Sequence, residues 1–343
     1  MSFSRIVLRV PNWLGDAVMA LPAIGAVCRR AGASAVTLAA STSVAPVFAE
    51  DIGLEGIETL VLPSGRRAQI AAIAAGRFDL AILLTNSFGS AWVVRRAGVA
   101  ERWGYRSDFR RVLLTRAVPK PRGRVHQADY YRQLVAKLDM PASETPRRIA
   151  VTGATRSRAE DLLAARGWDL RRALVGFAPG AAYGHAKRWP PARVAELIAR
   201  LTNERDVTAV LVGAAGDRDA GREIESSLAR HGGRPDRMLN LIGQTDLRSA
   251  MGVLACCRAF VSNDSGAMHL AAALGVPVAA IFGPTDERVT APIGDHDVIV
   301  HQVFCRPCML RDCPIDHRCM KGITPAMVFD AVSRRLEGLR IEK

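Results

Sequence analysis

The sequence predicts an α/β protein made of two doubly wound domains, each built on a parallel β-sheet. Two patterns indicate this class. First, continuous apolar runs alternate with segments of helical spacing, which is typical of parallel strands buried by helices on both faces. Second, this alternation runs through the chain twice, interrupted by a polar stretch at residues 141–172. A length of 343 residues also fits two domains better than one.

The first half supplies four strands and four helices to this prediction. The strands are the apolar runs, and the helices are the segments whose apolar residues recur at every third or fourth position. We expect strands at 5–10, 35–40, 58–63 and 78–86, and helices at 17–32, 66–76, 87–98 and 126–139. Short runs between polar turns are typical of a sheet that is covered on both sides.

The second half restarts the alternation after the polar stretch. We expect strands at 173–180, 207–213, 238–243, 259–263 and 276–283, and helices at 190–201, 245–257 (with Thr245 as N-cap), 265–275 and 324–340. We therefore divide the chain into domains at 1–165 and 166–323, with 324–343 as a C-terminal helix crossing back to the first domain. In such sheets ligands bind at the carboxyl ends of strands, so chemistry is expected in the loops that follow them.

Composition narrows the class of protein further. Hydrophobic residues make up 49% and charged residues 23%, an ordinary globular mixture. No apolar run is long enough to span a membrane, and early charges argue against a leader peptide, so we expect a cytoplasmic protein. The net charge of +14 indicates affinity for phosphates of nucleic acid, nucleotide or anionic lipid. The 47 basic residues include only five Lys, and the Arg residues are scattered, which weakens the nucleic-acid interpretation.

The loop after the first strand contains one acid, Asp16, directly after Gly15. Asp is a favoured helix N-cap, and Asp16 precedes a clear helix, so capping is one interpretation. The other is general-base catalysis, because an ionised carboxylate can take a proton from a hydroxyl that becomes acidic as it attacks. Trp13 is bulky for a solvated turn and suits the wall of a pocket.

The loop PGAAYGHAKRWPP (179–191) follows the first strand of the second half. Its small residues allow backbone N–H groups to face an anion, and Lys187 adds a positive charge. The alternative is an ordinary glycine-containing connection with a surface lysine.

The loop after strand 259–263 brings four small polar residues to a helix start: Asn263, Asp264, Ser265 and Gly266. They suit hydroxyl groups and a diphosphate at a helix N-terminus, with His269 one turn further on. The alternative is a helix cap by Asp264 or Ser265, with His269 as a core histidine.

Two further features leave their roles open. Asp217 lies in VGAAGDRDAG (212–221), which lacks the G-x-G-x-x-G pattern, so it either reaches a ribose or caps a helix. Four cysteines crowd into 305–319 with the C-x2-C spacing of a zinc knuckle in the first pair: Cys305, Cys308, Cys313 and Cys319. Packed thiols or a redox bridge are the alternatives to metal.

Together these loops resemble one family. The segments PNWLGDAVMALPAI (11–24), AKRWPP (186–191) and NDSGAMHLAAALGVPVAAIFGPTD (263–286) look like motifs of glycosyltransferase family 9, the ADP-heptose:lipopolysaccharide heptosyltransferases of Gram-negative bacteria. The resemblance covers almost the whole chain in the right order, and the three motifs jointly are specific. The PNWLGD form and the CRPC…CP…HRCM tail are more similar to heptosyltransferase II than to I.

The resemblance implies a GT-B fold, two Rossmann-like domains facing a central cleft. It implies that Asp16 is the general base of an inverting transfer and that Asn12 and Trp13 contact the acceptor, the lipid A-linked inner-core oligosaccharide. On the donor side it implies that ADP-heptose is bound by Lys187, Asp264, Ser265, Gly266 and His269. The same role is implied less directly for Asp217. It implies no metal, no cofactor and no nucleic acid. It also implies a peripheral position on the anionic, cytoplasmic face of the inner membrane.

Rival interpretations remain at this stage. One is another GT-B nucleotide-sugar enzyme, either heptosyltransferase I-like or an epimerase. The other is a zinc-bearing nucleic-acid-binding protein, suggested by the net charge of +14 and the clustered cysteines.

Overall fold

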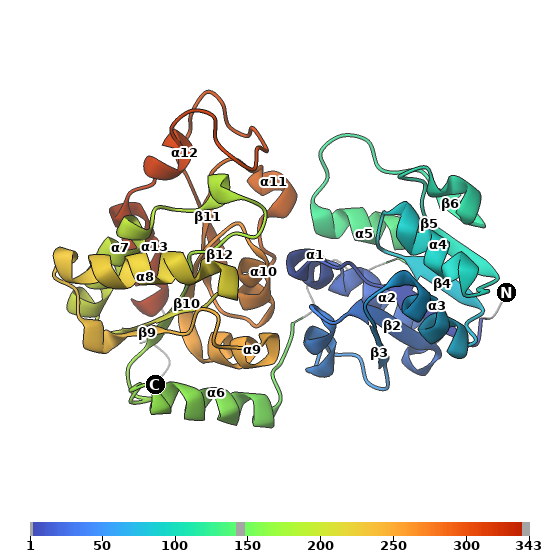
Figure 1. Ribbon diagram of the computed structural model, residues 1–343, viewed down its shortest axis with the longest axis horizontal. Helices are drawn as coiled ribbons and strands as arrows, with labels where there is room; N and C mark the ends of the chain where they lie inside the picture. Colours follow the sequence, from blue (N-terminus) through green and yellow to red (C-terminus); the bar gives the residue numbers. More distant parts are fainter. Residues whose placement is uncertain (1–2, 142–147, 338–343) are drawn as a thin grey trace. The chain divides into compact units, whose positions relative to one another are not determined.

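The computed structural model describes residues 3–141 and 148–337 and divides into two compact units, Met1–Ala150 and Val151–Lys343. Each unit contains one six-stranded sheet with flanking helices, and all of the pairings between the named strands are parallel (Figure 1). The predicted α/β class with two parallel sheets is confirmed.

The sheet of the first unit has the order β3-β2-β1-β4-β5-β6. Its strands are β1 (Ile6–Arg9), β2 (Val36–Ser41), β3 (Glu58–Leu62), β4 (Leu80–Leu83), β5 (Glu101–Tyr105) and β6 (Arg116–Val118). The order reverses between β1 and β4, so the loops after these two strands diverge to opposite faces of the sheet. This switch point is where doubly wound sheets bind ligands.

The helices of the first unit are α1 (Leu14–Met19), α2 (Leu21–Ala31), α3 (Arg66–Ala75), α4 (Phe88–Arg96) and α5 (Gln127–Ala136). The single helix expected at 17–32 is therefore two, divided at Ala20. Pro22 lies in the first turn of α2, where its missing N–H costs no helical hydrogen bond. The division leaves α1 as a separate short helix directly after the β1 loop.

The second unit repeats the topology, with the order β12-β11-β10-β7-β8-β9 and the switch point between β7 and β10. Its strands are β7 (Leu174–Ala178), β8 (Thr208–Leu211), β9 (Met238–Asn240), β10 (Cys257–Asn263), β11 (Val278–Phe282) and β12 (His296–Val300). The strands β7, β8 and β11 are buried along their whole length, as continuous apolar runs predict.

The helices of the second unit are α6 (Gly153–Ala165), α7 (Pro191–Glu204), α8 (Arg218–Leu228), α9 (Leu247–Cys256), α10 (Gly266–Ala273), α11 (Glu287–Thr290), α12 (Arg318–Lys321) and α13 (Pro325–Glu337). Asp246, not Thr245, is the N-cap of α9, and its carboxylate accepts a hydrogen bond of 2.7 Å from Ser249 N–H. No helix of the described residues is long and apolar enough to cross a bilayer.

The units divide at residue 150 rather than at 165. The reason is α6, which packs on α9 of the second unit. The described part of the expected C-terminal helix, α13, packs against α7, β10 and β11 of the second unit. Val328, Phe329 and Val332 of its apolar face join the core of that sheet. Residues 142–147 of the predicted linker and 338–343 of the predicted helix lie outside the described residues.

Candidate active site

In the second unit, the loops after β7 and β10 are joined by Asn263 at the end of β10. Its buried side-chain amide donates to the carbonyl oxygens of Pro179 at 2.7 Å and Gly180 at 3.3 Å. Its Oδ1 accepts a hydrogen bond of 3.2 Å from Trp189 N–H. One side chain thus fixes both ends of the 179–189 loop, which follows from the adjacency of β7 and β10 at the switch point.

Lys187 and Asp264, predicted from separate loops, form an ion pair. Lys187 lies in the short 3₁₀ turn η4 (His185–Lys187), and its Nζ is 2.6 Å from Asp264 Oδ2. The two side chains are only 12% and 6% exposed. The Lys187 ammonium also lies 4.7 Å from the centre of the Tyr183 ring. A shielded cation therefore sits at the carboxyl edge of this sheet.

The start of α10 adds backbone donors to this edge. Ser265 is its N-cap and Gly266 its first residue, yet the Ser265 hydroxyl makes no capping bond and lies 3.0 Å from Ser262 Oγ. Neither residue caps α10 as the alternative interpretation expected: Ser265 makes no capping bond, and the carboxylate of Asp264 pairs with Lys187. His269 is buried in the first turn and a half of α10, at 4% exposure.

Asp217 belongs to the same edge. It ends the 3₁₀ turn η5 (Ala215–Asp217), where its Oδ2 accepts from Ala214 N–H at 3.2 Å. Its Oδ1 accepts from Arg188 Nη2 at 3.4 Å. A Cβ atom added to Gly180 would lie 2.2 Å from Asp217 Cγ, so the carboxylate rests against the glycine backbone. Asp217 closes the 3₁₀ turn that precedes α8 and contacts the β7 loop, but as the N-cap residue of α8 it makes no side-chain capping bond, so the predicted helix cap is not formed.

Arg188 was quoted in a motif above without a role, and Asn263 was grouped with residues that suit hydroxyl groups and a diphosphate, whereas its side chain holds the 179–189 loop. Arg188 Nε is buried without a hydrogen bond among the described residues, while Nη2 binds Asp217. An arginine next to Lys187 was a local signal, since both follow the same strand. The role of Asn263 depends on strand order, which the sequence did not show.

In the first unit, the loop after β1 is held by a buried arginine. Arg9 Nη1 donates to the carbonyl oxygens of Val10 at 2.8 Å and Ala39 at 3.1 Å, and Nη2 donates to Asn12 Oδ1 at 2.7 Å. Burial lowers the pKa of Arg9 to about 10, which leaves it charged at neutral pH. Asn12, expected to contact the acceptor, is exposed but orientated by this bond. A charge at the end of an apolar strand was the signal that sequence reasoning missed.

Asp16 lies in the first turn of α1, half-buried, while the N-cap position belongs to Trp13. Asp16 Oδ1 accepts a 3.3 Å hydrogen bond from the Tyr131 hydroxyl of α5, and that hydroxyl accepts from Gln127 Nε2 at 2.9 Å. Burial, and then the Asp16 charge, raise the pKa of Tyr131 well above its ordinary value, so the phenol stays a donor. The Tyr131 hydroxyl of α5 therefore orientates the Asp16 carboxylate in the first turn of α1.

Trp13, the other expected acceptor contact, is 65% exposed. The loop after β4 brings a further polar side chain, Asn86, to the same edge of the sheet as Asp16. Asn86 Oδ1 accepts from the Tyr130 hydroxyl at 2.9 Å, and Asn86 O accepts from Ser107 Oγ at 2.8 Å. Burial raises the pKa of Tyr130. The loops after β1 and β4 thus both carry polar side chains at the switch point of the first unit, and the sequence carried no motif that marked Asn86.

The cysteine cluster packs behind the Lys187 loop. The four cysteines of the cluster are not joined by disulfide bonds, and a cavity of about 20 Å³ is lined by Cys305, Cys308, Cys313 and Cys319 together with Ala186. Ala186 N–H donates to Arg311 O at 2.9 Å, which ties the segment to the loop. Burial raises the pKa of Cys319. Within residues 3–141 and 148–337, no group of three or more His, Cys, Asp or Glu side chains is arranged to hold a metal ion.

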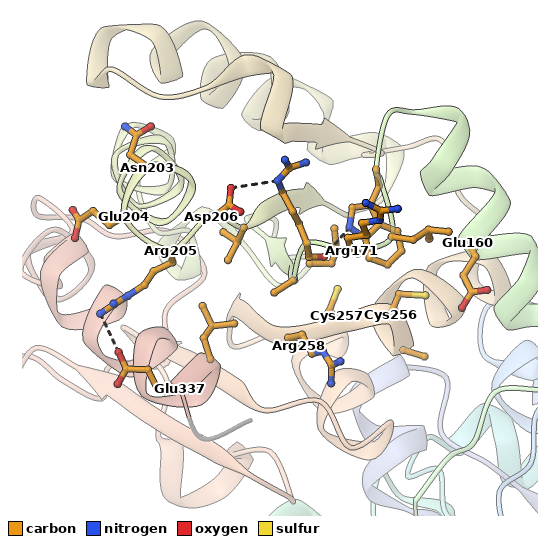
Figure 2. A pocket seen from close by; sticks show the side chains of 18 of the residues that line it. Glu160, Arg171, Asn203, Glu204, Arg205, Asp206, Cys256, Cys257, Arg258 and Glu337 are labelled. Atoms are coloured by element: carbon orange, nitrogen blue, oxygen red, sulfur yellow. Dashed lines mark hydrogen bonds and ion pairs between the residues drawn. The ribbon is translucent and has the colours of Figure 1, made fainter. Parts of the chain in front are cut away.

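A cavity of about 820 Å³ lies at the other end of the second sheet (Figure 2). Leu174, Val207 and Cys257, at or just before the amino ends of β7, β8 and β10, line it. Most of its charges are paired, as Figure 2 shows for Arg205 with Glu337, 3.2 Å apart. None of the predicted site residues lines this cavity. The candidate donor site is therefore the carboxyl edge of the second sheet, where those residues lie.

Tandem doubly wound units with charged and polar loops at each switch point have the architecture of enzymes that bind nucleotide-containing ligands at the carboxyl ends of their strands. Comparison with known proteins narrows this class. Residues 66–318, well over half of the chain, match Glycosyltransferase family 9 (heptosyltransferase), and the chain belongs to this family.

The relatives cover nearly the full length. The chain is 32% identical over 318 residues to lipooligosaccharide heptosyltransferase 2 of Haemophilus ducreyi, covering 87% of this chain and 89% of that protein. It is 32% identical over 302 residues to lipopolysaccharide heptosyltransferase 2 of Escherichia coli K12, covering 84% and 85%. The solved structure of E. coli ADP-heptose lps heptosyltransferase II superposes with a TM-score of 0.82 at 28% identity, over 98% of this chain and 99% of that one.

Proposed function

We propose that this enzyme transfers L-glycero-D-manno-heptose from ADP-heptose to a heptose of the lipopolysaccharide inner core. The observation that carries the proposal is the likeness to E. coli heptosyltransferase II, which extends over 98% of the chain. Three relatives that are 31–32% identical to this chain bear the name heptosyltransferase 2, which favours the second inner-core transfer over the first.

The second unit holds the donor in this proposal. Lys187, which is paired with Asp264, binds the diphosphate of ADP-heptose. Its positive charge stabilises the negative charge that develops on the diphosphate as ADP leaves. The open N-terminus of α10, at Ser265 and Gly266, supplies backbone N–H groups and the positive end of a helix dipole. Asp264, Asp217 and His269 complete the donor side around the sugar and ribose. The support is their common position at one sheet edge.

The first unit supplies the base. Asp16 takes the proton of an acceptor hydroxyl as that oxygen bonds to the anomeric carbon, while the bond from this carbon to the diphosphate oxygen breaks. ADP leaves with the electron pair, and a single displacement inverts the anomeric configuration. The hydrogen bond from Tyr131 supports the assignment, because a general base needs a fixed orientation. Asn12 and Trp13 are the proposed acceptor contacts beside it.

The acceptor proposed here is anchored in a membrane through lipid A. Residues 1–150 carry 21 basic and 11 acidic side chains, a net +10 of the +14 of the whole chain. This excess supports a peripheral position of the enzyme on the anionic, cytoplasmic face of the inner membrane.

Transfer assays with purified enzyme test the proposal. We expect ADP release from ADP-heptose with an inner-core acceptor that ends in one heptose, and none with an acceptor that lacks heptose. The reverse preference would identify a heptosyltransferase I activity. Turnover of ADP-heptose with no acceptor requirement would favour an epimerase and overturn the proposal.

A thermal-shift panel of ADP, UDP, GDP and NAD gives an independent check, since a bound ligand raises apparent stability. We expect ADP to give the largest shift. The zinc-bearing nucleic-acid-binding alternative instead predicts stoichiometric zinc and salt-dependent RNA or DNA binding.

A further inference from the structure

The segment between β5 and β6 exposes two large apolar side chains at the carboxyl edge of the first sheet. Phe109 is 95% exposed and Val112, in the 3₁₀ turn η3 (Arg110–Leu113), is 76% exposed. Phe88, at the start of α4 nearby, is 41% exposed. Exposed apolar groups gathered at one place mark interaction surfaces more often than single ones do.

Hydrogen bonds of the neighbouring residues hold the backbone that carries these side chains. Arg110 beneath them is fully buried, with Nε donating to Tyr105 O at 2.8 Å and Nη1 to Thr85 O at 2.5 Å. Asp108 Oδ2 accepts from Phe88 N–H at 2.6 Å. Phe109 itself has a left-handed backbone, φ 56°, which costs a bulky residue strain. The strain persists because these bonds fix both sides of the residue.

The stretch of sequence that contains this apolar tip, Phe109 with Val112, is strongly basic. Residues 95–124 contain ten basic and two acidic side chains, a net +8 of the chain's +14. Arg106 and Arg111 flank the tip, are exposed, and make no side-chain hydrogen bond or ion pair among the described residues. Arg95 Nη1 donates to Val112 O at 3.4 Å, which brings a third cation to the same place.

We infer that this segment, Arg106–Leu113 with Phe88, is the surface that docks on an anionic lipid bilayer. An aromatic and a branched aliphatic side chain between free arginines match the boundary between acyl chains and phosphate headgroups. Phe109 and Val112 enter the acyl boundary, and Arg106 and Arg111 bind lipid phosphates. The inference deepens the proposed function and rests on its lipid-anchored acceptor, since docking at this edge keeps the Asp16 and Asn86 loops near the membrane surface.

The test is sedimentation of the full-length enzyme with vesicles of phosphatidylcholine alone and of equal parts phosphatidylcholine and phosphatidylglycerol. We expect binding to the anionic vesicles only. The double variant Phe109→Ser with Val112→Ser should bind at least about tenfold more weakly, because two apolar side chains that enter the bilayer are lost. Arg106→Gln with Arg111→Gln should lose about tenfold and show a smaller salt dependence.

Two matched controls accompany these variants. Phe304→Ser removes an 80% exposed aromatic of the second unit that also has an arginine, Arg318, over its ring. Arg29→Gln with Arg30→Gln removes two charges from the last turn of α2 in the first unit. Both should bind vesicles like the unchanged enzyme, and equal losses in the controls would overturn the inference.

A soluble acceptor without lipid separates this inference from the proposed function. The Phe109 and Val112 variant should transfer to it at the unchanged rate. If this variant loses that activity, Phe109 and Val112 bind glycan. If its mass in size-exclusion chromatography is lower than that of the unchanged enzyme, the two side chains mediate self-association. Either result, or vesicle binding that survives the substitutions, overturns the membrane assignment. Absence of transfer by the unchanged enzyme contradicts only the proposed function.

Discussion

The Lys187–Asp264 ion pair can be tested separately for stability and for donor binding. Lys187→Met leaves a carboxylate that is 6% exposed without its cation 2.6 Å away. Removing one partner of a buried pair costs about 3–5 kcal/mol. For a unit of this size, 1 kcal/mol corresponds to about 2–4 °C, so we expect the melting temperature of the second unit to fall by about 6–20 °C. Calorimetry without donor measures it.

Adding Asp264→Asn removes the uncompensated charge, so most of the lost stability should return. Replacing both partners of a buried ion pair by uncharged residues often changes the free energy of unfolding little. Donor affinity should not return. A charge-assisted hydrogen bond to phosphate contributes about 1.5–3 kcal/mol, so titration calorimetry should show ADP binding about 10- to 150-fold weaker than in the unchanged enzyme.

Arg234→Met is the control, because its pair with Asp236 is exposed and should be worth less than about 1 kcal/mol. A double variant that binds ADP-heptose like the unchanged enzyme would refute the donor role of Lys187. A single variant that melts like the control would refute the buried pair itself.

Three further outcomes are expected. Asp16→Asn should lower turnover about 10²–10⁴-fold with ADP-heptose affinity unchanged, measured by ADP release and calorimetry; surviving turnover would leave Asp16 a structural acid. Tyr131→Phe should lower kcat about 2- to 10-fold with the donor KM unchanged, since one hydrogen bond to the base is lost; a changed donor KM and intact kcat would contradict this. Gly180→Ala should destabilise the protein by about 1–3 kcal/mol and weaken ADP binding, because the new Cβ meets the Asp217 carboxylate; an unchanged melting temperature would show that the loop yields freely.

The central strands could be predicted from sequence because they are buried on both faces and read as continuous apolar runs. The strands β5, β6 and β12 were missed. Their sequences, ERWGY, RAV and HDVIV, carry charged residues and are only partly buried. The edge strands β6 and β12 have a neighbour on one side only, and β5 lies next to an edge, so these strands are less buried and their patterns do not differ from those of loops.

The loops of the candidate site were found because parallel strands end at one edge. Their contacts were not, since Lys187 and Asp264 are 77 residues apart and meet only because β10 pairs with β7. Tyr131 had no local signal at all. It lies in an ordinary amphipathic helix, and its role depends on the packing of α5 against α1.

The hydrogen bond between Tyr131 and Asp16 spans 115 residues of sequence. A ribosome makes Asp16 early and α5 almost last in the first unit, and at about 5–20 residues per second the end of α5 follows the last strand, β6, by about 1–4 s. During that time the acid has no phenol beside it and the buried faces of α1 and α2 lack their cover. The first unit therefore gains the hydrogen bond that orientates Asp16 only when α5 is made, and a translation pause before residue 127 would leave the faces of α1 and α2 that pack on α5 uncovered.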